Sequence, residues 1–177
     1  GLLAVADEAA AGQPQEARSL YEAFLGEFPL CWGYWKRLAD LQPSQGERCA
    51  VYACAAAGPA GACVDLWAHY LDDAAGESVP EDSGGASGAS ARRELFERAL
   101  AACGLDWRAG PLWERYLDFE EGLKDWSRLA GLFRRALEVP MEALPAVRLR
   151  LRALLLGDAC PPLEPFALAL GFPDAAA

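Results

Sequence analysis

Three carboxylates follow a pair of aromatic residues in the stretch LWERYLDFEE, residues 112 to 121, and paired carboxylates can act as general acid and base. The acids concerned are Asp118, Glu120 and Glu121. Such catalysis also needs a cleft, perturbed pKa values and usually a third group. Two similar segments carry an aspartate at the equivalent position, Asp40 and Asp72, so the acids recur with a pattern. We therefore interpret them as the exposed C-terminal end of a helix.

The other candidates for chemistry lack the partners that their reactions need. His69, the single histidine, stands in LWAHYLDD without a serine or cysteine nucleophile motif. The glycine-rich residues 83 to 88 lack the Lys-Ser/Thr ending of a phosphate loop and follow no strand pattern. The six cysteines form no C-x-x-C pair, so a four-ligand zinc site is not indicated. We predict no enzyme, no cofactor and no metal ion, and reduced cysteines that act as small apolar residues.

The charge of the chain limits the classes of partner. A net charge of −10 argues against a simple nucleic-acid-binding domain. Seven of the 16 basic residues nevertheless lie between Lys124 and Arg152. RNA contact through Arg148, Arg150 and Arg152 therefore remains an alternative to solvated helix faces.

Two further sequence features concern membranes and the start of the chain. No window approaches the roughly 18 to 20 apolar residues of a membrane span. The opening GLLAVADEAAAG has no basic region ahead of its apolar residues, which favours an internal segment of a longer protein over a signal peptide.

A tryptophan heads a similar short pattern in three segments. Residues 34 to 42 read YWKRLADLQ, residues 66 to 73 read LWAHYLDD and residues 112 to 120 read LWERYLDFE. A Leu or Tyr follows each tryptophan by three positions, which places both side chains on one face of a helix. The residues of this first signature are Trp35, Leu38, Trp67, Tyr70, Trp113 and Tyr116. We expect them to wedge between neighbouring helices, and we expect Trp32, Trp107 and Trp126 to be more exposed.

A second pattern, an aliphatic residue followed by an aromatic one, alternates with the first. Its four copies read ARSLYEAFL from residue 17, RCAVYACAA from 48, RRELFERAL from 92 and LAGLFRRAL from 129. Three of the copies then place an alanine where a small side chain lets two helices approach closely. The residues of this second signature are Leu20, Tyr21, Val51, Tyr52, Leu95, Phe96, Ala99, Leu132, Phe133 and Ala136.

The two patterns share one period. Trp67 lies 32 residues after Trp35, and Val51 lies 31 after Leu20. Trp113 lies 46 after Trp67, but this interval contains a Gly/Ser/acid-rich stretch, residues 74 to 90, which we interpret as a flexible surface insertion. Without the insertion the period is again that of helix-pair repeats.

Prolines and glycines stand where such a repeat needs its helices to stop. Gly122 is the predicted end of the helix that contains the third tryptophan segment, residues 112 to 120. The sequence therefore predicts an all-α fold, an α-solenoid of antiparallel helix pairs similar to HAT and TPR repeats. Residues 1–145 form the predicted array, and residues 146–177 form a trailing helix and a Pro/Ala-rich tail.

The two signatures resemble half-a-TPR (HAT) repeats, which are known mainly from RNA-processing scaffolds. Residues 17 to 42, 64 to 73 and 95 to 144 resemble the first repeats of the pre-mRNA-processing factor 39 family, and in the last two stretches the order, spacing and turn residues agree. The Ala-rich second copy of the aliphatic–aromatic helix and the stretch 74–90 depart from the family pattern.

The resemblance implies a nuclear splicing scaffold of the U1 small nuclear ribonucleoprotein, which recognises the 5′ splice site. It implies other splicing-factor proteins of this particle as partners, with RNA bound only indirectly. It also implies dimerisation of the full-length protein through repeats outside this segment. The family offers no catalytic residues to transfer.

Overall fold

The computed structural model describes residues 13–76 and 86–156, with the backbone alone for residues 86 and 87. These residues form helices and no strands, which confirms the predicted all-α solenoid class. The α-helices are α2 (Pro14–Glu27), α3 (Trp32–Asp40), α4 (Gln45–Ala57), α5 (Val64–Ala75), α6 (Ala86–Cys103), α7 (Gly110–Leu123), α8 (Trp126–Glu138) and α9 (Leu144–Leu156). A short 3-10 helix, η1 (Pro59–Ala62), lies between α4 and α5. None of the described helices combines the length and hydrophobicity of a membrane-spanning segment.

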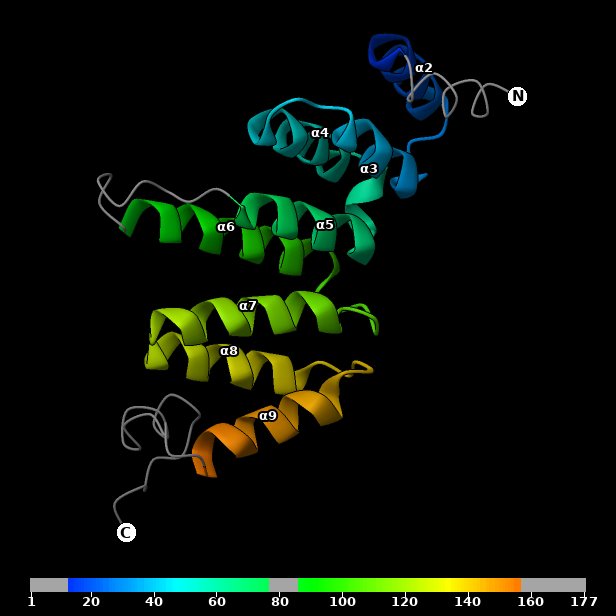
Figure 1. Cartoon of the computed structure of the whole chain (residues 1–177). Coiled ribbons are helices and arrows are strands. Elements are labelled where there is room, and N and C mark those ends of the chain that lie inside the picture. Colours follow the sequence, from blue (N-terminus) through cyan, green and yellow to red (C-terminus); the bar gives the residue numbers. More distant parts are fainter. Residues whose placement is uncertain (1–12, 77–85, 157–177) are drawn as a thin grey trace. The chain divides into compact units, whose positions relative to one another are not determined.

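The chain divides into two compact units, residues 1–103 and 104–177. In the first unit α3 packs on α2, α4 and α5, and α5 packs on α4 and α6 (Figure 1). Helices α3 and α5 carry the Trp signature and alternate with α2, α4 and α6, which carry the aliphatic–aromatic signature. The unit therefore consists of a leading helix followed by two helix pairs.

Aromatic rings fill the space between these helices. The Tyr34 ring of α3 lies 6.0 Å from that of Tyr21 and 4.9 Å from that of Phe24, both in α2. In the next repeat the Tyr52 ring stacks at 5.8 Å on Tyr70 of α5. Packing of aromatic rings of this size stabilises the contacts between these helices.

The second unit contains the third helix pair, α7 and α8, followed by α9, which packs on α8 (Figure 1). The connection before α7 touches the connection before α9, because the Glu142 amide donates to the Trp107 carbonyl at 2.8 Å. A Cβ at Gly110 would lie 2.5 Å from the Cβ of Ala143. Glycine at position 110 therefore permits this close approach of backbone segments.

Local sequence sets several helix ends. The Ser44 side chain accepts from the Glu47 amide at the start of α4, and the Asp125 side chain accepts from the Arg128 amide at the start of α8. Helix α7 ends at Leu123, one residue beyond the predicted Gly122, because Lys124 adopts the left-handed conformation with φ of 56°. Here a lysine holds the position that glycine usually takes.

Helices reach into both ends of the predicted insertion. Helix α5 runs to Ala75 and α6 begins at Ala86, so both ends of the stretch 74–90 are helical; residues 77–85 lie outside the described residues. The domain bounds 1–145 and 146–177 stay a prediction, and the last described helix begins at Leu144. The predicted tail from Gly157 also lies outside the described residues.

Alkaline pH should destabilise the first unit through Tyr52, which is 1% exposed. Burial raises the pKa of its phenol above the ordinary value near 10, and the carboxylates of Asp73 and Asp40 raise it further. The folded chain therefore keeps the phenol neutral at a pH where the unfolded chain ionises it. The contribution of the neutral phenol to the free energy of unfolding is complete below the pKa of the unfolded chain, and it is lost as the pH rises through the higher pKa of the folded chain.

The variant Tyr52→Phe isolates this effect. Its free energy of unfolding should fall less steeply than that of the wild type from about pH 9 to about pH 12, the range that begins where an unfolded tyrosine ionises. Denaturant titrations at a series of pH values would measure both slopes. Parallel curves would show that Tyr52 ionises equally well in the folded chain.

Candidate interaction surfaces

Each signature tryptophan donates its indole N–H to a backbone carbonyl in the connection that precedes its helix. The Nε1 of Trp35 lies 2.8 Å from the Pro29 oxygen, that of Trp67 2.7 Å from the Gly61 oxygen, and that of Trp113 2.9 Å from the Gly104 oxygen. The ring thus fills space between helices while its polar atom fixes the preceding turn. The sequence pattern identifies the three rings, but it does not indicate these acceptors.

The tryptophans differ in burial. Trp67 and Trp113 are 2% and 3% exposed, whereas Trp35 is half-buried. Tyr70 and Tyr116, three positions further, are buried, and so is the smaller Leu38. Among the remaining tryptophans Trp107 is 60% exposed, while Trp32 and Trp126 are half-buried.

The second signature lies on the inner side of its helices. Its aromatic rings are buried in all four copies, and the alanines that follow them in three copies are buried as well. These buried residues are Tyr21, Tyr52, Phe96, Phe133, Ala55, Ala99 and Ala136. Of the aliphatic partners, Leu132 is buried, and Leu20, Val51 and Leu95 are half-buried. Both signatures therefore contribute to the inter-helical core.

The acids Asp118, Glu120 and Glu121 of α7 are either buried or paired with an arginine. Asp118 is exposed, but Glu120 is only 1% exposed, which corrects the prediction that the whole run is exposed. No buried side-chain nitrogen or oxygen in the described residues lacks a hydrogen-bond partner, so the Glu120 carboxyl is satisfied. Asp118 and Glu121 instead bind Arg150 of α9, with its Nη1 and Nη2 each 2.6 Å from a carboxylate oxygen.

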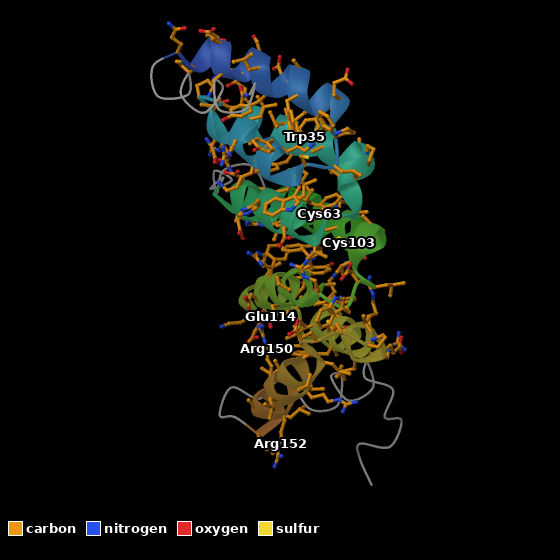
Figure 2. All side chains as sticks on the ribbon, turned by 90° about the vertical axis from the view of Figure 1, so that its right-hand side faces the viewer. Trp35, Cys63, Cys103, Glu114, Arg150 and Arg152 are labelled. Carbon is orange, nitrogen blue, oxygen red and sulfur yellow. The ribbon has the colours of Figure 1, made fainter. Side chains whose placement is uncertain are left out.

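The arginines of the RLRLR run, residues 148 to 152, lie on two different faces of helix α9. Successive residues are 100° apart, so Arg150 lies opposite Arg148 and Arg152. Figure 2 shows Arg150 on the α7 side of α9 and Arg152 on the other side. Burial acts to lower the pKa of Arg150, but hydrogen bonds to Glu121 and Asp118 outweigh it and raise this pKa. Arg148 and Arg152 are exposed beside Leu151 and Leu155.

His69 and the cysteines also have structural surroundings. The His69 ring stacks on Trp32 of α3 at 5.7 Å, with both residues half-buried. Cys31, Cys49, Cys54, Cys63 and Cys103 are free thiols, and Cys160 lies outside the described residues. In the described part of the chain no three His, Cys, Asp or Glu side chains gather as metal ligands would.

Alternating helices with a Trp signature and an aliphatic–aromatic signature define a HAT-repeat protein. The family model of the PRP39 N-terminal HAT repeat matches residues 1–150, and the chain belongs to this family.

Several curated proteins are similar to the chain. Pre-mRNA-processing factor 39 of Xenopus laevis is 33% identical over 137 residues, which is 71% of this chain and 20% of that protein. The Schizosaccharomyces pombe protein of the same name is 34% identical over 126 residues, which is 70% of this chain and 19% of that protein. Human spliceosome associated factor 3, U4/U6 recycling protein, is 34% identical over 88 residues, 48% of this chain and 9% of that protein. The chain thus spans about a fifth of the pre-mRNA-processing factor 39 relatives.

Proposed function

We propose that this chain is a non-enzymatic protein–protein interaction scaffold in pre-mRNA splicing. The observation that carries the proposal is the match of residues 1–150 to the PRP39 N-terminal HAT repeat. Helix-pair arrays present extended surfaces and enclose little chemistry, which suits the binding of other proteins. The proposed location is the nucleus. Dimerisation of the full-length protein would use repeats outside this segment.

The proposed partners are other splicing-factor proteins of the U1 small nuclear ribonucleoprotein, in an assembly that acts in 5′ splice-site recognition. RNA would be bound only indirectly. The net charge of −10 supports partners with basic segments, because complementary charge speeds and orients association.

Affinity capture from nuclear extract tests this proposal. The intact chain, tethered at one end, should enrich U1 particle proteins, and treatment of the extract with ribonuclease should leave part of this set bound. Beads carrying an unrelated acidic helical-repeat protein are the matched control. Equal recovery on both supports would contradict the proposal.

Direct RNA binding is the second candidate, and the basic run of α9 is the observation that favours it. The scaffold proposal predicts no measurable affinity for a labelled single-stranded RNA at an ionic strength of about 0.15 M. RNA binding through Arg148, Arg150 and Arg152 predicts affinity that falls steeply with salt.

Charge reversal separates contributions within the run. If α9 binds RNA, the double variant Arg148→Glu/Arg152→Glu should lose most of the affinity, because these two side chains share the exposed face. Arg150→Glu should mainly lower stability, because Arg150 binds Asp118 and Glu121. Fluorescence anisotropy and thermal melting would distinguish the two effects.

A further inference from the structure

A hollow of about 440 Å³ opens beside Trp35 in the first unit. It lies between α2, α3 and α4, and its walls include Leu25, Leu38, Val51 and Cys54. Glu22 is an exposed acid in the lining, and the lining residues include no cation. Figure 2 shows Trp35 among the helices of this unit. The hollow is therefore an apolar slot with one carboxylate at its edge.

The first repeat is the helix pair α3–α4, and the other two repeats are the pairs α5–α6 and α7–α8. These other two repeats carry larger side chains at two positions that line the hollow in the first. Where the first repeat has Leu38, the others have Tyr70 and Tyr116. Three residues after the aliphatic member of the second signature, the first repeat has Cys54, and the others have Arg98 and Arg135. The smaller leucine and cysteine account for the open space.

The two arginines show what this position can hold. The guanidinium carbon of Arg98 lies 5.8 Å from the ring centre of Trp67, and that of Arg135 lies 5.6 Å from the ring centre of Trp113. These are cation–π distances. Each arginine stem also adds apolar cover, and both of these tryptophans are almost fully buried while Trp35 is not.

We propose that the hollow binds an arginine side chain of a partner protein, in the place that Arg98 and Arg135 occupy in their own repeats. The methylene stem would contact Leu25 and Val51, and the guanidinium would cover Trp35 and face Glu22. Arginine suits the slot better than lysine because its flat cation stacks on an aromatic face and is more weakly hydrated. The slot would accept an arginine of this kind whether or not the partner is a splicing protein.

Indole N–H signals in ¹⁵N-correlated NMR spectra of the intact chain provide the test. The probe is an acetylated, amidated peptide, Ala-Ala-Arg-Ala-Ala, and its matched control replaces arginine with citrulline, which has the same shape without the charge. The Trp35 signal should shift and saturate with the arginine peptide. Citrulline should weaken binding about tenfold. The signals of Trp67 and Trp113 should stay unchanged, because arginines already cover those rings.

Variants of the slot make the test specific. Cys54→Arg should place a guanidinium of the chain itself over Trp35 and abolish the Trp35 response, whereas Cys54→Ser should retain it. Glu22→Gln should weaken binding severalfold. Because Cys54 and Glu22 are exposed, all three variants should fold, and circular dichroism would verify this.

Several outcomes would overturn the proposal. One is a Trp35 indole signal that does not shift when the arginine peptide is added. Another is an equal response to citrulline, or equal shifts at Trp35 and the exposed Trp107, which would indicate non-specific contact. A Trp35 shift that follows protein concentration alone would assign the hollow to a second copy of this chain. A saturable response to a uridine oligonucleotide but not to the peptide would assign it to base stacking.

Discussion

Replacing Trp113 with alanine should lower the free energy of unfolding of the second unit by about 3 to 5 kcal/mol, the range for truncating a large buried aromatic residue. The ring is 3% exposed, and its indole N–H donates to the Gly104 carbonyl at 2.9 Å. Truncation leaves a cavity between helices and removes the donor from that carbonyl. Denaturant titration followed by circular dichroism would measure the loss.

Trp107→Ala is the matched control in the same unit. This ring is 60% exposed, so its loss should change stability by no more than about 0.5 kcal/mol. Trp113→Phe would separate packing from hydrogen bonding, because phenylalanine keeps an aromatic ring and lacks the donor. An unchanged unfolding midpoint for Trp113→Ala would place this ring outside the core and contradict the repeat packing.

Adding one methyl group at Gly61 should destabilise the first unit by about 1 to 3 kcal/mol. A Cβ at this position would overlap the carbonyl oxygen of Ala56 and stand 3.1 Å from its carbonyl carbon. Backbone atoms cannot swing aside as a side-chain end can, so the 3-10 turn must shift. Because the Gly61 carbonyl accepts from Trp67, that shift would also disturb the buried indole.

Gly131→Ala adds the same methyl group but should change the free energy of unfolding in the opposite direction. Gly131 lies inside α8 with nothing within 4 Å of an added Cβ, so alanine should raise stability by about 0.5 to 1 kcal/mol. Thermal melts of both variants against the wild type would compare them. If Gly61→Ala were neutral, η1 would not be the rigid acceptor that the Trp67 contact requires.

The helix pairs were predictable because bulky and small residues recur with a single period. Residues such as Phe133 and Ala136 lie where helical spacing places them, on the inner face of α8. The indole acceptors were not predictable, because every residue offers the same backbone carbonyl. The separation also varies: Trp35 and Trp67 reach back six residues, whereas Trp113 reaches back nine.

Position on the helix surface, which differs from position in the sequence, decides the surroundings of two charged residues. Glu120 follows Trp113 by seven positions and Tyr116 by four, so it belongs to the buried stripe of α7, and the prediction that it is exposed is wrong. Arg150 is adjacent to Arg148 and Arg152 in the basic run, but helical geometry turns it to the opposite side of α9. RNA contact through these three arginines stays a prediction.

The residues that the repeats share indicate the family, and the residues at which one repeat differs from the others indicate where a partner could bind. The family follows from the regular features, which the PRP39 N-terminal HAT repeat model matches over residues 1–150. A surface for a partner is better sought where the repeats differ. Cys54 is such a position, because the arginine that covers the tryptophan in two repeats is missing from the first.

Hydrogen–deuterium exchange of the indole N–H protons in the intact chain tests whether the signature tryptophans hold the helix pairs together, because one experiment reports on all three of them. Exchange should be slowest at Trp67 and Trp113, slower at half-buried Trp35 than at Trp107, and rapid at Trp107. If Trp67 or Trp113 exchanged as fast as Trp107, the tryptophans would not lock the helix pairs together.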